Sequence, residues 1–277
     1  MRLRKILVVA KKEFMDNVRN RWLIVLTAIF MVLTVASSIL AGEGKLGRIE
    51  ATVITLLSLS SMLVPIIAVV LAYGTIAAEA ESGALSVVLA YPVKRIEVVL
   101  GKFLGLSSVV ASSVIIGFGS AGVIISLATD WSEWKDYGIF MLLTILLGVL
   151  YISLSVCFSS LMKKRSTALG AGVLIFFWGM IIGSIWLGIY AATGGSLTEL
   201  YTGSVDKFPS WFWYEIFLSP QDGNQAATML AFGQKEIMGF TFEMPHWVNL
   251  KNIVLAQLIW TAVPLLLSIY FFRRRDI

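Results

Sequence analysis

The sequence predicts an all-α, polytopic membrane protein with six transmembrane helices. The composition, the long uncharged runs and the placement of the basic residues carry this prediction. Of the 277 residues, 58% are apolar and only 14% are charged, and the mean hydropathy is +0.85. Soluble domains are about half apolar and about a quarter charged. The apolar excess extends along the whole chain, which excludes a soluble enzyme, a disordered protein and a disulfide scaffold.

Six runs without Asp, Glu, Lys or Arg are long enough to cross a bilayer, whose core of about 30 Å needs about 20 helical residues. We predict spans at 22–42, 51–78, 103–129, 137–162, 166–192 and 252–272. The fifth uncharged run is longer than one span needs, so it is expected to leave the membrane near Gly194 and Gly195. No repeat or low-complexity linker divides the chain, which we interpret as one transmembrane domain, 1–277.

The basic residues predict the orientation, because they favour the cytoplasmic side of a membrane. With the N-terminus inside, the inner segments hold 16 of the 22 Lys and Arg residues and the outer segments hold 6. The 17 acidic residues divide the other way, with 6 inside and 11 outside. Both termini are therefore expected in the cytoplasm, and the chain in the inner or plasma membrane. A net charge of +5 also suits nucleic acid, but the position of the charges at the span ends argues against that partner.

Residues 1–21 predict an amphipathic helix that lies in the inner membrane interface. Apolar side chains recur there at helical spacing, at Leu3, Ile6, Leu7, Ala10, Phe14 and Val18. The apolar run 6–10 is too short for a cleaved signal peptide and continues into Lys11 and Lys12. A solvated basic leader is the alternative interpretation.

The chain carries no recognisable catalytic constellation. No P-loop is present, so this chain is not expected to bind ATP that way, and no metal-ligand spacing such as H-E-x-x-H or C-x-x-C occurs. The only cysteine is Cys157, and the only histidine, His246, lies outside the uncharged runs. Ion-driven carriers usually need ionisable groups within the membrane, although backbone carbonyls can bind sodium without them. The lack of such groups in the six runs makes a secondary carrier a weaker hypothesis.

Glycine motifs within the spans are better explained by helix packing than by ligand binding. Residues 117–122 fit G-x-G-x-x-G, but they lie in the middle of the third span rather than between a strand and a helix. Two G-x-x-x-G pairs, 101–105 and 179–183, have the spacing that lets neighbouring helices approach closely.

The inner loop 79–95 predicts a short helix held between the second and third spans. Ser82 and Gly83 break the chain after the second span, and Pro92 stops the helix that follows at 84–91. Leu85, Val88 and Leu89 share one face of that helix. The helix could lie flat on lipid, or it could dock in a groove of a cytoplasmic partner and pass movement to the spans.

Three segments make the chain similar to the permease subunits of type-2 ABC transporters. These are K-E-F from Lys12 with R-N-R-W from Arg19, the loop 79–102, and the terminal F-F-R-R-R-D-I from Phe271. Within that family the chain looks most like the permease of the nitrous-oxide-reductase maturation system. The resemblance covers the six-span layout of nearly the whole chain.

The resemblance implies a permease pair docked on two separate ATPase subunits, which would hold ATP and Mg; the permease chain itself would hold no cofactor. The second permease would be a like or an unlike chain. The loop helix would be the coupling helix, with the coupling residues Glu79, Glu81, Gly83, Leu85, Val88, Leu89, Tyr91, Pro92 and Arg95. Lys12, Glu13 and Phe14 would mark the interfacial helix. We further hypothesise a charge network that joins Glu79 and Glu81 to Lys12 or Arg95; solvated helix-end charges are the alternative.

The outer region 193–251 combines an aromatic segment from Trp211 with a breaker at Ser219 and Pro220. Ala226, Met229, Leu230 and Ile237 suggest a second amphipathic stretch. In the resembled family, short helices before the last span dip back into the outer leaflet; a docking surface at 197–250 for an extracytoplasmic partner is the alternative. Three methionines and the histidine, Met229, Met238, Met244 and His246, offer soft ligands for Cu(I), but packing explains methionines more often.

These observations favour the membrane-spanning half of an ATP-driven transporter, with membrane lipid as its surroundings. The resemblance implies that the transporter is an exporter. Ser, Thr and aromatic side chains of the second and fifth spans would line a path whose substrate the sequence does not specify. Two alternatives remain: a membrane scaffold or assembly factor that moves nothing, and a secondary carrier. No enzyme chemistry is expected in this chain.

Overall fold

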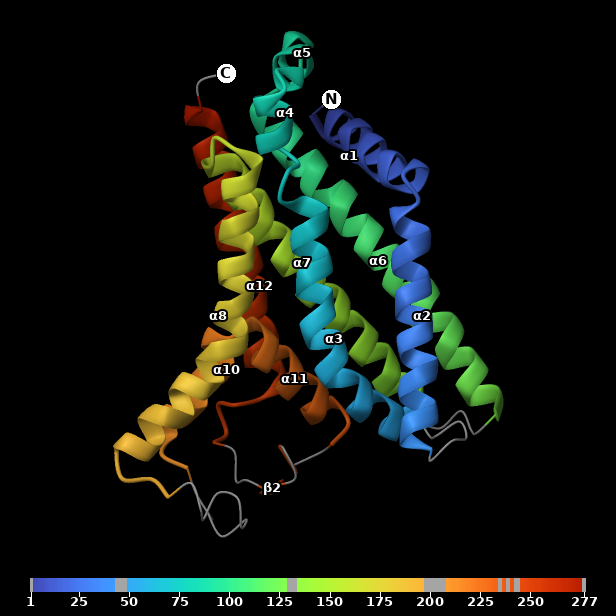
Figure 1. Cartoon of the computed structure of the whole chain (residues 1–277), viewed down its shortest axis with the longest axis vertical. Helices are drawn as coiled ribbons and strands as arrows, with labels where there is room; N and C mark the ends of the chain where they lie inside the picture. The colour runs from blue at the N-terminus through green and yellow to red at the C-terminus, as the bar shows by residue number, and fades with distance from the viewer. Residues whose placement is uncertain are drawn as a thin grey trace.

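The computed structural model describes residues 2–42, 49–128, 134–196, 208–233, 236–237, 240–241 and 245–275. It is an almost entirely helical bundle, and six of its helical segments are long and apolar enough to cross a membrane. The prediction of an all-α protein with six spans is therefore confirmed (Figure 1).

The long helices are α2 (Trp22–Ala41), α3 (Ile49–Ala72), α6 (Arg95–Ala128), α7 (Trp134–Leu161), α8 (Arg165–Ala192) and α12 (Leu250–Arg274). After a turn, α4 (Ala77–Glu81) extends the second span, and α5 (Ala84–Ala90) follows it. α1 (Arg2–Arg19) precedes the bundle. The segment before α12 holds η1 (Ser210–Tyr214), α10 (Glu215–Leu218), α11 (Pro220–Ala231), and the paired strands β1 (Glu236–Ile237) and β2 (Phe240–Thr241). α6 begins eight residues before the third uncharged run, so Arg95, Glu97 and Lys102 lie within a helix.

α6 and α7 form the centre of the bundle, where α6 packs against α1, α2 and α7, and α7 packs against α3 and α12. Phe118 of α6 contacts both Phe30 of α2 and Phe140 of α7, at centroid distances of 5.0 and 5.5 Å. A Cβ at Gly117 would lie 2.7 Å from the Cβ of Phe30. The glycine motif at 117–122 therefore serves helix packing, as predicted.

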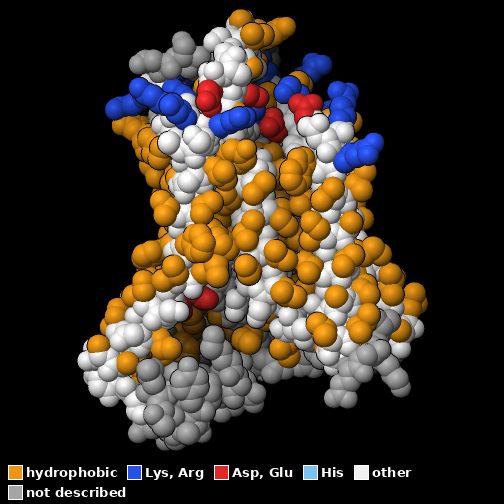
Figure 2. All heavy atoms as spheres, in the orientation of Figure 1, with side chains coloured by type: hydrophobic (Ala, Val, Ile, Leu, Met, Phe, Trp, Pro, Cys, Tyr) orange, Lys and Arg blue, Asp and Glu red, His pale blue; other side chains and the backbone are white. Residues whose placement is uncertain are grey.

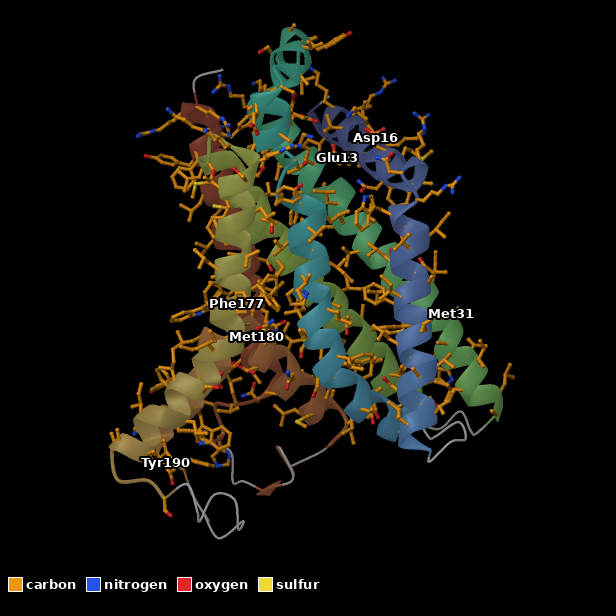
Figure 3. The ribbon with its side chains drawn as sticks, viewed as in Figure 1. Glu13, Asp16, Met31, Phe177, Met180 and Tyr190 are labelled. Atoms are coloured by element: carbon orange, nitrogen blue, oxygen red, sulfur yellow. The ribbon has the colours of Figure 1, made fainter. Side chains whose placement is uncertain are left out.

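Both chain termini and α5 lie at the same end of the bundle, which we call the charged end (Figure 1). Lys and Arg side chains gather at this end, and below them the visible face is mostly apolar (Figure 2). Phe177 and Met180 of α8 are each nearly half exposed on the outside of the bundle (Figure 3), as lipid contact requires.

α1 crosses the charged end and packs closely on the first turns of α6 (Figure 1). A Cβ at Gly105 would lie 2.6 Å from the Cβ of Glu13 and 2.7 Å from the carbonyl oxygen of Ala10. The glycine pair at 101 and 105 thus lets α1 reach the α6 backbone. Leu3, Leu7 and Val8 stay exposed, so α1 presents an apolar surface to its surroundings. Its position in the membrane interface stays a prediction.

At the opposite end, α11 packs against α3, α7, α8 and α12, so it lies among the spans rather than on them. The expected second amphipathic stretch is shorter than predicted: α11 ends at Ala231, Gly233 follows at φ 66°, and Ile237 belongs to β1. Met229 packs against the main core and His246 is exposed, whereas Met238 and Met244 lie outside the described residues.

Candidate coupling site

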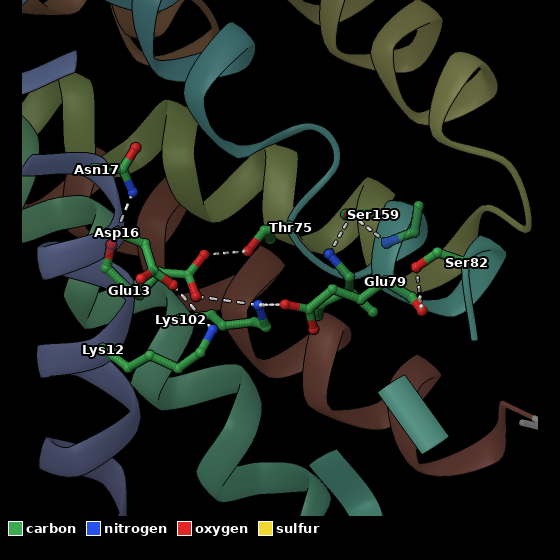
Figure 4. Close-up of polar contacts among 11 residues, drawn as sticks. Lys12, Glu13, Asp16, Asn17, Thr75, Glu79, Ser82, Lys102 and Ser159 are labelled. Atoms are coloured by element: carbon green, nitrogen blue, oxygen red, sulfur yellow. Dashed lines mark hydrogen bonds and ion pairs between the residues drawn. The ribbon is translucent and has the colours of Figure 1, made fainter. Parts of the chain in front are cut away.

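A buried ion cluster joins α1, α4 and α6 at the charged end (Figure 4). Lys102 Nζ lies 2.7 Å from Glu79 Oε1 and 3.1 Å from Glu13 Oε2. The Lys102 side chain is only 4% exposed, and those of Glu13 and Glu79 are 14% and 25% exposed. Burying an ammonium group is costly unless carboxylates compensate it, and here two do so. We call Glu13, Lys102 and Glu79 the inner ion cluster.

Hydrogen bonds extend this cluster to the turn between α3 and α4. Thr75 donates its hydroxyl to Glu13 Oε1 at 3.2 Å. Ser159 Oγ of α7 accepts from the backbone N–H groups of Ile76 and Ala77 at 3.0 and 2.9 Å. These N–H groups open α4 and would otherwise lack an acceptor, so Ser159 holds the start of α4 against α7.

Lys12 and Asp16 form a separate and exposed ion pair on α1, at 3.1 Å. Their side chains are 60% and 44% exposed, so the pair contributes little stability. Burial lowers the pKa of Lys12, but the hydrogen bond to Asp16 and the nearby Glu13 and Glu79 carboxylates outweigh it and raise that pKa. The charge of Glu79 therefore contributes to the raised pKa of Lys12, although the ion pair of Lys12 is with Asp16.

Glu81 lies on the other side of α4 and reaches α8. Its Oε2 accepts from the backbone N–H of Arg165 at 3.2 Å, at the beginning of α8. A carboxylate at this position also faces the positive end of the α8 dipole. The two acidic residues of α4 thus contact different spans: Glu79 contacts α6 and Glu81 contacts α8.

α5 projects from the charged end between α4 and α6 (Figure 1). Gly83 at φ 76° provides the left-handed turn that separates α4 from α5. Leu85 is fully buried, whereas Val87 and Tyr91 are 63% and 66% exposed. Lys5 of α1 donates to the carbonyl oxygen of Pro92, which ties the end of this loop to α1. The side chains of Val88 and Leu89 lie outside the described ones, and Phe14 packs against the core.

Arg95 connects the start of α6 to the end of the chain. Its guanidinium donates to the carbonyl oxygens of Phe272, Arg273 and Arg275 at 2.9, 3.0 and 2.7 Å. A cation is favourable there because the last carbonyls of α12 have no partner within the helix. Arg95 therefore fastens α12 to α6 and makes no contact with Glu79.

The structure brings together Glu13 and Glu79, places Lys12 nearby, and separates Glu81 and Arg95 from them. The hypothesised partners of Glu79 thus differ from the observed one, which is Lys102. Sequence reasoning missed Lys102, Thr75 and Ser159 as members of the site. Lys102 was visible only as one basic residue among many at the inner ends, although its place beside Gly101, on the face that meets α1, was a usable signal.

The chain is similar in sequence to known proteins along nearly its whole length. The family model for the ABC-2 family transporter protein matches residues 7–277. The chain is 33% identical to the "Probable ABC transporter permease protein NosY" of Stutzerimonas stutzeri, over 96% of this chain and 97% of the relative. It is 31% identical to the protein of the same name from Pseudomonas aeruginosa, over 97% of this chain and 98% of the relative. The chain therefore belongs to the ABC-2 family of transporter proteins, as a membrane-spanning permease subunit that is not itself catalytic.

Proposed function

We propose that this permease receives ATP-driven movement from a separate ATPase subunit through α5 and transmits it to the spans through the inner ion cluster. The observation that carries the proposal is the placement of α5. The helix projects from the bundle with Val87 and Tyr91 exposed, yet it is anchored by the buried Leu85. A partner that moves α5 would pull directly on α4, whose Glu79 and Glu81 reach α6 and α8.

The assembly proposed is a permease pair with two ATPase subunits, on which ATP and Mg would be bound. The charged end, with both termini and α5, would face the cytoplasm because basic residues favour that side of the membrane. The chain would then be a multi-pass protein of the inner or plasma membrane. Export is the proposed direction of transport, and the family resemblance supports it.

A second candidate function is that of an assembly factor, in which the movement serves an extracytoplasmic partner at 197–250 and no substrate crosses the membrane. The observation that favours it is the packing of α11 against four spans, which would carry movement to the outer end. Substrate-dependent stimulation of ATP hydrolysis would support transport, and stimulation by an outer partner alone would support assembly.

The coupling proposal is tested by adding a charge to the exposed face of α5. The tagged chain is purified in mild detergent from its own membranes, and the co-purified ATPase and its hydrolysis rate are measured. We expect Val87→Asp and Tyr91→Asp to remove most of both. Asn20→Asp, an equally acidic change at an exposed position after α1, should leave both unchanged. Full ATPase recovery with the two α5 variants would overturn the proposal, since both positions are exposed and the changes should not unfold the chain.

A further inference from the structure

Two carboxylates meet inside the outer half of the bundle, far from the charged end. Glu215 of α10 and Asp222 of α11 bring their carboxylates to the same point on α8. A Cβ at Gly183 of α8 would lie 3.6 Å from both Glu215 Oε1 and Asp222 Oδ2. Figure 2 shows an acidic side chain in a hollow of the apolar face, away from the charged end. We call Glu215 and Asp222 the outer acid pair.

Two further oxygen atoms beside this pair are buried and unpaired. Tyr151 of α7 is fully buried and Gln221 of α11 is 3% exposed. The hydroxyl of Tyr151 and Oε1 of Gln221 have no hydrogen-bond partner among the described residues, nor does Glu215 Oε1. Both approach Gly179, one turn before Gly183, where a Cβ would lie 2.8 Å from the Tyr151 hydroxyl. Buried polar atoms are rarely left without a partner, so this group of oxygens points to a ligand.

No basic side chain that the structure describes reaches these oxygens. Residues 208–231 contain no Lys, Arg or His, and neither do the nearby runs of α7 and α8. Among the described residues, no basic side chain lies within 4.0 Å of either carboxylate. Two ionised carboxylates that face the same point repel each other strongly where water is scarce. Among the described residues, these oxygens therefore lack a compensating cation.

The remaining titratable groups of the packed elements make other contacts. Tyr190 of α8 packs on Phe208, Tyr214 of η1 stacks on Trp247, and Lys251 of α12 is exposed. The electrostatic influence of Asp222 reaches Tyr151, which places that hydroxyl next to the pair. Tyr151 is therefore the one further titratable group that the structure describes beside the two carboxylates.

We propose that Glu215 and Asp222, with Tyr151 and Gln221, bind a small monovalent cation, which is a proton or an alkali-metal ion. Three of the four side chains come from the outer segment, whereas the tyrosine and the two facing glycines belong to α7 and α8. The bound cation would hold α10 and α11 against these two spans. Burial and the neighbouring Asp222 raise the pKa of Glu215, which favours a proton near neutral pH.

The test is made on the full chain in lipid nanodiscs, without the ATPase. Infrared difference spectra record the carbonyl band of protonated carboxyl groups while the pH is raised, first in choline chloride and then in sodium or potassium chloride of equal ionic strength. Intrinsic tryptophan fluorescence gives the thermal unfolding midpoint under the same conditions. Glu215→Gln and Asp222→Asn are compared with Asp136→Asn, an acidic residue in the first turn of α7.

If the ligand is a proton, the native chain shows a carboxyl band that persists to neutral pH and disappears at alkaline pH. This band is lost in Glu215→Gln and Asp222→Asn but remains in Asp136→Asn. Sodium or potassium in place of choline does not change it. If it is an alkali-metal ion, that salt removes the band and raises the unfolding midpoint of the native chain but not of Glu215→Gln. Either result supports the site. It is overturned if the native chain shows neither such a band nor any difference between choline, sodium and potassium. The measurements on the native chain decide between these outcomes even if a neutral variant fails to fold.

Discussion

The two ends of this permease bury acidic side chains in opposite ways. At the charged end, Glu13 and Glu79 share the ammonium group of Lys102, so the protein carries its own compensating charge. At the outer end, Glu215 and Asp222 face each other with no basic side chain of the described residues within 4.0 Å. The first pair of carboxylates has a basic partner among the described residues, and the second has none.

The inner ion cluster joins its helices through ion pairs within the chain, whereas the outer acid pair joins its helices only when a cation is bound. The inner ion cluster holds α1, α4 and α6 together because Lys102 pairs with a carboxylate from each of the other two helices. The outer acid pair holds α10 and α11 to the spans only while a cation is present. An ABC-2 permease with such a pair would have a rigid end where movement enters and an adjustable end where it leaves.

The largest effect is expected from Lys102→Met, which leaves the two carboxylates of the inner ion cluster without a basic partner, as in the outer acid pair. Two carboxylates would remain close together without a cation, and we expect a loss of about 2–4 kcal/mol in unfolding free energy. Thermal unfolding in nanodiscs measures it. The additional changes Glu13→Gln and Glu79→Gln should restore most of the loss, because they remove the uncompensated charge. A triple variant as unstable as Lys102→Met would contradict a charge-based explanation.

A smaller loss is expected when the close approach of α1 to α6 is blocked. The Cβ of Gly105→Ala would meet the backbone carbonyl of Ala10, which a side-chain rotation cannot relieve. We expect a cost of about 1–3 kcal/mol, as for other overpacked sites. Gly188→Ala in α8 is the matched control, since nothing lies within 4 Å of its Cβ. Equal thermal midpoints for the two variants would show that α1 is not clamped at Gly105.

The outer acid pair predicts that the stability of the folded chain depends on pH. The pKa of Glu215 is raised in the folded chain, so its contribution is full below the ordinary glutamate pKa and is lost as the pH rises through the raised value. Between these limits the unfolding free energy should fall as the pH rises, by about 1–2 kcal/mol in total, and the thermal midpoint should fall with it. Glu215→Gln should flatten this slope. A slope that survives unchanged in Glu215→Gln would assign it to other groups.

The sequence predicted the spans well because each depends on a local property, the absence of charge over about 20 residues. The helix at 84–91 followed from the breakers Gly83 and Pro92, and α5 indeed runs from Ala84 to Ala90. The glycine pair 101–105 predicted a close helix contact, and the structure shows that the partner is α1. Such features are encoded within a few neighbouring residues.

Contacts between distant residues were beyond this reasoning. Glu79 pairs with a lysine 23 positions away and shares it with Glu13, which is 89 positions from that lysine. Glu215 and Asp222 lie outside every uncharged run, so no sequence pattern predicted their position beside α8. Only the packing of α11 among four spans brings them there. Charge-free runs locate spans, but they do not locate charges that fold back between spans.

The smallest effect is expected from Lys12→Met, which removes the exposed pair with Asp16 but leaves the inner ion cluster intact. With side chains 60% and 44% exposed, this pair should contribute at most about 0.5 kcal/mol, and salt should screen it. The pKa of Lys12 is raised in the folded chain, so its contribution is full near neutral pH and disappears only at strongly alkaline pH. Thermal midpoints at low and high salt measure it against Lys102→Met. Because both lysines lie at the charged end and near Glu79, a loss from Lys12→Met as large as that from Lys102→Met would mean that burial does not set the strength of these pairs.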